Sequence, residues 1–335
     1  MSWLVETRLI NEPFSDPGLF IDFQFGRRAI LLDLGDLAPL SARELLRATD
    51  VFVTHRHMDH FAGFDRLLRV ALYRPGLLRL IGPPGLIDGI AAKLHGYLWN
   101  LLDAESPDFA ILAAEFADGR VGPWTKFRAR DAFHPSDGGP SNLSPGRVLL
   151  EPDLWIECVT LDHSTPCLAF CLQERLRVNV SRPALDQLGL PVGPWLNIAK
   201  RAVRNGAMDD TMIAISEGRS MRLGALKEQA LRVGSGQRVA YVTDAAFTPE
   251  NVKRILSVAR DAHQLYIEAA FLEADAQLAA ERCHLTARQA GTLARLAGAR
   301  RLTTFHYSPR YLDRPDSLRL EAEAAYHEDR SEGSS

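Results

Sequence analysis

One short segment constrains this chain more than any other. The apolar run at residues 51–54 is followed at once by His55, His57, Asp59 and His60, four potential metal ligands within six residues. Imidazole and carboxylate groups together suit Zn²⁺ and other borderline divalent cations. On a tight loop, this spacing can direct two imidazoles at one ion and a carboxylate with a third imidazole at a neighbouring ion. The segment therefore predicts a metal centre, with a polar surface loop as the weaker alternative.

Further ligand-type residues follow other apolar runs. His163 comes after residues 154–161, while Asp244 and His306 stand at the ends of two later runs. A lone histidine or aspartate at a strand end is more often a turn residue. Three such cases beside the first motif favour a site with two ions, which in hydrolases lie roughly 3.5–4 Å apart. Asp244 is the candidate for a bridging carboxylate, and His134 is a weaker alternative ligand.

Hydrophobic periodicity predicts a mixture of strands and helices. Short apolar runs predict buried strands at residues 29–34, 51–54, 78–82, 154–161, 168–172, 238–243, 264–268 and 301–306. Spacings of three and four predict helices at residues 41–49, 86–102, 249–262 and 286–297. Clusters of glycine and proline predict loops at residues 136–146 and 188–208. The mixture predicts an α/β (α+β) protein whose sheets are covered by helices.

Composition excludes several classes of protein. Hydrophobic residues make up 46% of the 335-residue chain and the net charge is −3, so a strongly basic, non-specific nucleic-acid binder is disfavoured. The four cysteines form no CxxC pair and are expected to be buried free thiols. No apolar run approaches the roughly 18 residues needed to cross a bilayer. With no basic and then apolar segment at residues 1–6, a cytoplasmic protein is expected.

Several separate motifs carry a family resemblance. They are the His-x-His-x-Asp-His segment, Ile-Gly-Pro-Pro-Gly-Leu at 81–86, Leu-Asp-His at 161–163, Val-Thr-Asp at 242–244 and His-Tyr-Ser-Pro-Arg-Tyr at 306–311. Together they resemble the metallo-β-lactamase superfamily and, within it, ribonuclease Z, the endonuclease that trims the 3′ end of precursor tRNA. The block at 306–311 is the motif most specific to that branch. The resemblance covers roughly residues 20–312.

The resemblance implies a fold and a ligand set. The fold would be a single-domain, four-layer αββα sandwich over residues 1–312, with a short substrate arm at 188–208. Residues 313–335 would form a charged C-terminal helix or tail that ends in disorder. Two Zn²⁺ ions are implied, although sites of this kind also accept Mn²⁺ or Fe. One ion would be held by His55, His57, His163 and Asp244, and the other by Asp59, His60, His306 and Asp244.

The resemblance also assigns catalytic roles. Asp59 would orient the attacking water or accept its proton, and His284, supported by Glu268, would protonate the leaving oxygen. A carboxylate that holds an imidazole protonated makes a sensible acid near neutral pH. The alternative for Glu268 is a solvated acid at a strand end. Arg310 would contact a substrate phosphate with its planar fork, or else form a structural ion pair at a turn.

The function implied is a binuclear zinc phosphodiesterase that processes the 3′ end of tRNA, as a homodimer without membrane association. Lys200, Arg201 and Arg204 follow the arm motif and would meet RNA phosphates, or else lie on an amphipathic helix beside a turn. The segment Ile-Glu-Ala-Ala at 267–270 resembles the family's His-Glu-Ala-Thr segment, but Ile267 and Ala270 replace its histidine and threonine. Two alternatives therefore stay open, namely hydrolysis of a small ester, thioester, lactone or sulfate, and a non-catalytic scaffold.

Overall fold

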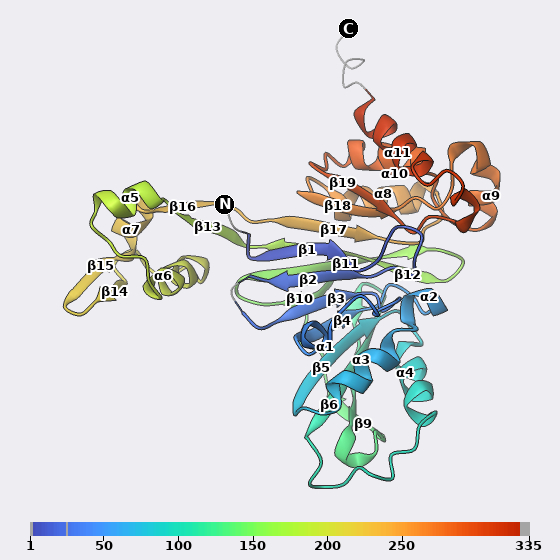
Figure 1. Cartoon of the computed structure of the whole chain (residues 1–335), viewed down its shortest axis with the longest axis horizontal. Coiled ribbons are helices and arrows are strands. Elements are labelled where there is room, and N and C mark those ends of the chain that lie inside the picture. Colours follow the sequence, from blue (N-terminus) through green and yellow to red (C-terminus); the bar gives the residue numbers. More distant parts are fainter. Residues whose placement is uncertain (1–2, 25, 329–335) are drawn as a thin grey trace.

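Two large β-sheets pack face to face in the computed structural model, which describes residues 3–24 and 26–328 (Figure 1). Helices cover the outer surface of each sheet, so the chain has the four-layer αββα architecture that the sequence predicts. No helix within the described residues is both long enough and apolar enough to cross a membrane.

The first sheet is built from the N-terminal part of the chain. In order, its strands are β1 (Val5–Leu9), β2 (Leu19–Phe23), β3 (Ala29–Leu32), β4 (Ala48–Phe52), β5 (Gly76–Gly82), β6 (Phe109–Ala117), β8 (Trp124–Arg128) and β9 (Pro135–Gly139), with β7 (Arg120–Val121) paired to β6. Its outer helices are α1 (Ala42–Leu45), α2 (Met58–Phe61), α3 (Phe64–Ala71) and α4 (Leu86–His95). Parallel pairing of β3, β4, β5 and β6 brings the C-terminal ends of these strands to one edge.

The second sheet comes from the C-terminal half. Its strands, in order, are β10 (Arg147–Leu150), β11 (Leu154–Asp162), β12 (Pro166–Glu174), β17 (Arg238–Val242), β18 (Gln264–Glu268) and β19 (Leu302–Phe305). Helices α8 (Pro249–Ala259), α9 (Ala276–Glu281), α10 (Ala287–Leu296) and α11 (Ser317–His327) cover it. Strands β17, β18 and β19 are parallel, so their C-terminal ends also share one edge.

Strand alternation explains the layers. On β3, Ile30 and Leu32 face the core between the sheets, whereas Ala29 and Leu31 face the core under the helices. All four side chains are buried, which is why the run reads as continuously apolar in the sequence. Burial on both faces leaves the strand ends as the places where polar side chains can gather.

The C-terminal helix α11 belongs to the packed body. Leu318, Ala322 and Ala325 are buried, and the first two join the core formed by α10 and the second sheet. A Cβ atom added to Gly291 of α10 would lie 2.1 Å from the carbonyl oxygen of Ala322, so only glycine permits this close approach. Packing therefore continues past residue 312. The disorder expected at the end of the chain concerns residues outside the described ranges.

Four local predictions are wrong in detail. The helix predicted at 41–49 is only α1, because residues 48–52 pair with β3 as strand β4. The helix predicted at 86–102 ends at His95, and Gly96 follows as its C-cap. Part of the loop predicted at 136–146 is strand β9, which pairs with β8. The loop predicted at 188–208 contains helix α6 (Trp195–Arg204). In the two strand cases, the hydrogen bonds come from a neighbouring strand that local composition does not reveal.

A separate body projects from the sandwich between β12 and β17 (Figure 1). Its stalk is the antiparallel ribbon of β13 (Leu176–Val180) and β16 (Leu231–Ser235). Its head contains α5 (Arg182–Gln187), α6, β14 (Met212–Ser216), β15 (Arg219–Arg222) and α7 (Leu223–Gln229). We call residues 176–235 the arm. It has its own hydrophobic core around Trp195 and Leu226, and the predicted arm at 188–208 is only its central part.

Candidate metal centre

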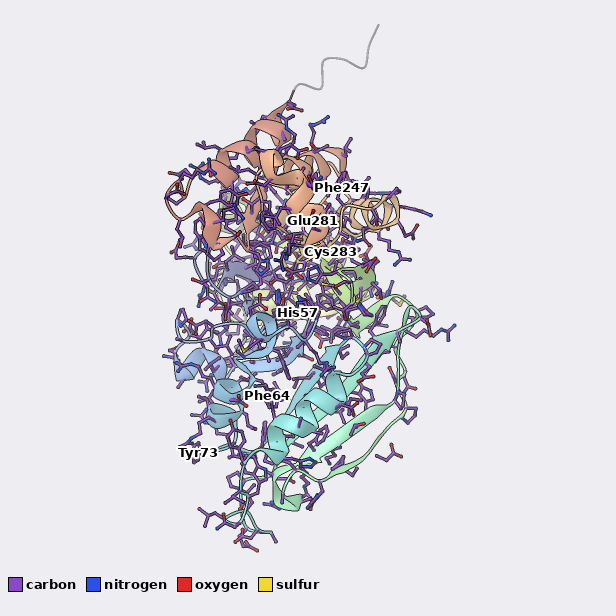
Figure 2. All side chains as sticks on the ribbon, turned by 90° about the vertical axis from the view of Figure 1, so that its right-hand side faces the viewer. His57, Phe64, Tyr73, Phe247, Glu281 and Cys283 are labelled. Atoms are coloured by element: carbon purple, nitrogen blue, oxygen red, sulfur yellow. The ribbon has the colours of Figure 1, made fainter. Side chains whose placement is uncertain are left out.

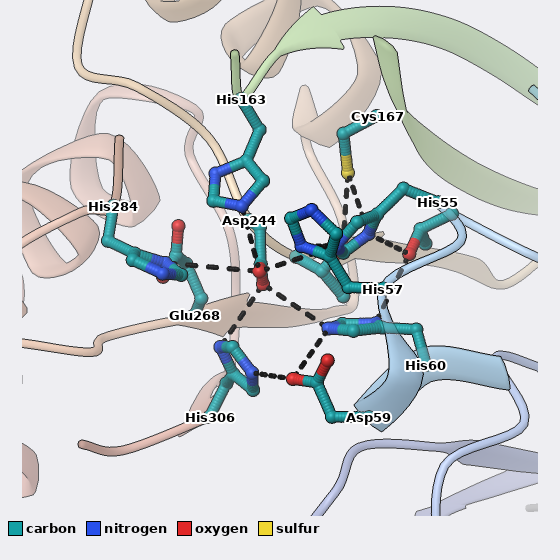
Figure 3. Close-up of polar contacts among 12 residues, drawn as sticks. His55, His57, Asp59, His60, His163, Cys167, Asp244, Glu268, His284 and His306 are labelled. Carbon is teal, nitrogen blue, oxygen red and sulfur yellow. Dashed lines mark hydrogen bonds and ion pairs between the residues drawn. The ribbon is translucent and has the colours of Figure 1, made fainter. Parts of the chain in front are cut away.

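The strand ends of both sheets converge on one cluster of imidazole and carboxylate groups (Figure 3). The segment from His55 to His60 follows β4 and enters the short helix α2, and His163 follows β11. Asp244 and His306 follow the parallel strands β17 and β19. The seven ligands that the family resemblance implies therefore lie together. Within each sheet, parallel strands deliver their C-terminal residues to one edge, and the edges of the two sheets meet at the cluster (Figure 3).

One oxygen of Asp244 faces the first group of ligands. Asp244 Oδ2 lies 3.6 Å from His55 Nε2 and 3.4 Å from His163 Nε2. His57 Nδ1 lies 3.0 Å from the same His55 nitrogen. One ligand atom from each of these four residues lies within 4.8 Å of all the others.

The other oxygen of Asp244 faces a second group. Asp244 Oδ1 lies 3.1 Å from His306 Nδ1 and 3.6 Å from His60 Nε2. Asp59 Oδ2 lies 3.1 Å from His306 Nε2 and 3.5 Å from His60 Nε2. The carboxylate of Asp244 is thus shared between two groups of imidazoles.

Unsatisfied buried atoms show that the residues fit a cation. His60 Nε2, His306 Nδ1 and Asp244 Oδ1 are buried and have no hydrogen-bond partner among the described residues. Buried polar atoms without partners are rare in native proteins, and each needs an explanation. A divalent ion would give all three a partner, and the His/Asp donor set suits such an ion.

Asp33 is a supporting residue that sequence reasoning missed. It is fully buried, and its carboxylate accepts hydrogen bonds from the Thr54 backbone N–H at 2.7 Å and the Tyr241 hydroxyl at 3.2 Å. Asp33 Oδ2 also lies 3.0 Å from His60 Nδ1, which turns His60 Nε2 toward Asp244. His163 Nδ1 is held in the same way, 2.8 Å from the Cys283 carbonyl oxygen. Such outer partners fix ring orientation at metal sites. The available signal was an aspartate inside an apolar run.

Electrostatics prepare the cluster for a cation. Burial, reinforced by neighbouring His60, lowers the pKa of His55 to about 2. Burial opposes ionisation of Asp59, but its hydrogen bond with His306 prevails and lowers the pKa to about 2. For His306, the carboxylates of Asp244 and Asp59 overcome burial and raise the pKa to about 10. Neutral imidazole and ionised carboxylate are the forms that bind metal. The raised pKa of His306 shows that the surrounding carboxylates stabilise positive charge at this position.

A carboxylate–imidazole pair lies beside the cluster. Glu268 is fully buried at the end of β18, and its Oε2 lies 2.8 Å from His284 Nδ1. Its Oε1 accepts the backbone N–H groups of Ala245 at 2.7 Å and Leu285 at 3.2 Å. Glu268 is therefore not a solvated acid. Burial lowers the pKa of His284, but the charge of Glu268 and its hydrogen bond outweigh burial and raise it.

The backbone is strained at several points around the cluster. Asp33, Ser164, Cys283 and His306 all have positive φ angles, between 56° and 62°. Non-glycine residues adopt this conformation at a cost, and such residues concentrate at functional sites. Ser164, Cys283, His306 and Ala270 line a cleft with a volume of about 540 Å³. Figure 2 shows His57, Cys283 and Glu281 on one face of the molecule.

The remaining candidate residues lie outside the cluster. Arg310 is in the short 3₁₀ helix η3 (Pro309–Tyr311) just after His306, and its side chain is exposed. His134 is also exposed, and it belongs to none of the groups of ligand-type atoms within the described part of the chain. Of the arm cations, Arg201 is exposed whereas Arg204 is buried. Ile267 is buried in the helix-facing core of the second sheet.

Comparison with known proteins identifies the family, although no family model matches the chain. The chain is 33% identical over 313 residues to ribonuclease Z of Deinococcus radiodurans, covering 92% of this chain and 91% of that protein. It is 25% identical over 292 residues to ribonuclease Z of Treponema pallidum (strain Nichols), covering 84% and 78%.

Solved structures agree on the fold. The short form of human tRNase Z superposes with a TM-score of 0.52 at 16% identity, covering 91% of this chain and 93% of that one. The metallo-β-lactamase fold protein YhfI of Bacillus subtilis has the same TM-score at 14% identity, covering 96% and 93%. The fold predicted from the sequence is thereby confirmed. Since the identity to the Deinococcus protein extends over nine-tenths of both chains, this chain belongs to the ribonuclease Z family of metal-dependent hydrolases with the metallo-β-lactamase fold.

Proposed function

We propose that this protein is a binuclear zinc phosphodiesterase that cuts RNA, with the 3′ end of precursor tRNA as its substrate. The observation that carries the proposal is the division of Asp244, whose two oxygens face two different groups of imidazoles. Two ions held side by side suit in-line displacement at a phosphoryl centre. The RNA substrate is inferred from the relatives, which are named ribonuclease Z.

The ligand set divides between the two ions. His55, His57 and His163 would hold one ion with Asp244 Oδ2, while Asp59, His60 and His306 would hold the other with Asp244 Oδ1. When bound, zinc lowers the pKa of water and polarises a phosphoryl oxygen. Mn²⁺ or Fe would fit the same donors.

The chain supplies proton transfer and charge. Asp59, ionised because its pKa is low, is suited to orient the attacking water or accept its proton. His284 presents Nε2 as an acid for the leaving oxygen, since Nδ1 is engaged by Glu268. The exposed guanidinium of Arg310 follows His306 closely in sequence and suits a phosphate oxygen.

The position of the arm supports action on a long substrate by a homodimer. β12 begins beside His163 and ends at Glu174, where the arm starts. Its nine residues span about 30 Å, so the arm base and the metal centre lie far apart. The head extends farther still from the sandwich (Figure 1). A second copy could bring its arm toward this site, and exposed Arg201 would contact RNA phosphates.

An exposed apolar surface provides a place for that second copy. Leu98 is 91% exposed, Leu101 86% and Tyr73 63%, around a hollow of about 950 Å³ between α3 and residues 97–107. Apolar patches of this kind mark interaction sites. The four free cysteines favour the reducing cytoplasm.

One substrate panel tests the proposal. The zinc-loaded protein should cut precursor tRNA once near the discriminator base and hydrolyse bis(p-nitrophenyl) phosphate. His57→Ala should abolish both activities, whereas His134→Ala, an exposed histidine outside the cluster, should retain them. Activity that survives both zinc stripping and His57→Ala would refute the metal mechanism. Hydrolysis of phosphodiesters without tRNA cleavage would refute the substrate, and preference for carboxylic esters would favour the small-ester alternative.

A further inference from the structure

The arm is joined to the sandwich in a way that leaves its direction poorly determined by the backbone alone. Its stalk contains only β13 and β16, which pair with one another and with no other strand among the described residues. A two-stranded ribbon alone is marginally stable in water. Side-chain contacts at the junction are therefore the candidates for fixing the angle between the head and the sandwich.

A buried ion pair spans this junction. Arg204 is the last residue of α6 in the head, and Glu174 is the last residue of β12 in the sandwich. Arg204 Nη2 lies 3.6 Å from Glu174 Oε1, with side-chain exposures of 8% and 0%. Arg204 Nε also donates to the Leu176 carbonyl oxygen at 3.3 Å, where the stalk begins. One side chain thus contacts the sandwich and the stalk from the head.

Glu174 also packs closely against residues 236 and 237, where the chain leaves the arm and returns to the sandwich. Glu174 Oε2 accepts the backbone N–H of Gln237 at 3.1 Å, and the Glu174 N–H donates to the Gln237 carbonyl at 2.8 Å. A Cβ atom on the intervening Gly236 would lie 1.9 Å from the Glu174 carbonyl oxygen, so no other residue fits there. The carboxylate of Glu174 is therefore held where the chain enters the arm and where it returns to the sandwich. Arg204 is the residue of the head that contacts it.

This geometry gives Arg204 a different role from the one its sequence position suggests. A side chain that is 92% buried and directed at Glu174 is not available to RNA phosphates. We infer that the Arg204–Glu174 ion pair is a positioning device that fixes the direction of the arm relative to the metal centre. The inference rests on the proposed function for its effect on RNA. It makes Arg204 and Glu174 determinants of large-substrate specificity that touch neither substrate nor metal.

The pair can be removed in two ways that separate position from stability. Arg204→Met leaves a buried carboxylate without its cation, which is costly for folding. The double variant Arg204→Met with Glu174→Gln removes both charges. The ion pair between the head and the sandwich is then lost, but no unpaired buried charge remains. Lys227→Met is the matched control because Lys227 forms an exposed ion pair with Asp209 inside the head, 2.7 Å apart. It removes the same charge from the arm and leaves the junction intact.

The first readout is kinetic. Both junction variants should raise KM for precursor tRNA, with kcat/KM falling about tenfold or more because reacting groups are misplaced. Their kcat and KM for bis(p-nitrophenyl) phosphate should stay at the wild-type values, as should both substrates with Lys227→Met. Arg204→Lys should restore part of the RNA activity. Equal loss in the control, parallel loss on the small substrate, or unchanged RNA cleavage would each overturn the inference.

The second readout does not need activity. Donor and acceptor dyes on the head and the sandwich report their distance distribution by single-molecule energy transfer in the full chain. The junction variants should broaden or shift that distribution, while Lys227→Met should match the wild type. An unchanged distribution in the double variant overturns the inference even if the protein cuts tRNA. A broadened one upholds the junction even if precursor tRNA proves not to be the substrate.

Discussion

Glu268 Oε2 lies 2.8 Å from His284 Nδ1, while Glu268 Oε1 is fixed by two backbone N–H groups. The carboxylate can neither turn away nor reach solvent, and it is hydrogen-bonded to the imidazole of His284. A buried acid with this geometry holds a proton on its partner in the pH range where free histidine begins to lose it.

That relationship predicts a pH dependence. The pKa of His284 is raised, so the protonated acid persists below that value and is lost as pH rises through it. Glu268→Gln removes the raising charge, and the basic limb of kcat should move to lower pH by roughly 1–3 pH units. Glu281→Gln, which removes an exposed carboxylate at the same cleft, should leave the limb in place. A basic limb that does not move in Glu268→Gln would show that another group sets it.

The second prediction concerns Asp33 behind the metal centre. Asp33→Asn should weaken metal binding about 10- to 100-fold, as loss of an outer partner does elsewhere, because His60 loses its carboxylate support. Competition between the protein and a chromophoric chelator measures this affinity. Asp36→Asn changes an exposed carboxylate three residues away and should have no effect. Equal affinities for the two variants would contradict the role given to Asp33.

Helix packing supplies the third prediction. Gly291→Ala places a methyl group where α10 approaches the Ala322 carbonyl oxygen, which should cost about 1–3 kcal/mol in the free energy of unfolding. Urea denaturation checks this value. Gly234→Ala, at a site with no atom within 4 Å of the added Cβ, serves as the control. A fully stable Gly291→Ala protein would mean that α10 and α11 can separate at no cost.

Self-association gives the fourth prediction. Leu98→Asp together with Leu101→Asp places charge in the apolar surface and should convert a dimer into a monomer. Light scattering coupled to gel filtration measures the mass directly. Leu320→Asp, which alters a leucine that is 55% exposed on α11, should leave the mass unchanged. A wild-type protein that is already monomeric would contradict the proposed contact.

The candidate ligands can be predicted in part because His55, His163, Asp244 and His306 stand within three residues after apolar strands. Their division between two ions comes from the family resemblance. Asp244 and His306 lie 189 and 251 residues after His55. The parallel pairing of β17, β18 and β19 explains why these two side chains meet at one edge of the second sheet. The role of Asp33 could not be predicted, because its partner Tyr241 is distant in the sequence and donates its hydroxyl hydrogen bond from the other sheet.

The arm was underestimated for a different physical reason. Its stalk pairs Leu176 with Ser235, two residues separated by the whole head, and nothing local in either strand reports its partner. Arg204 likewise looks like a solvent-facing cation on an amphipathic helix. Its burial follows from Glu174, which stands 30 positions earlier at the end of β12 and outside the arm.

The strand pairing at the junction shows where the arm is inserted into the second sheet. Gln173 pairs with Arg238 and Leu176 pairs with Ser235, so β12 and β17 are the two legs of one antiparallel hairpin. The arm is an expansion of the loop of that hairpin, entering and leaving through adjacent positions. Chain insertions at such points leave the host sheet's register untouched. The sandwich and the arm are thus structurally separable units, provided that the contact between Arg204 and Glu174 at the junction is kept.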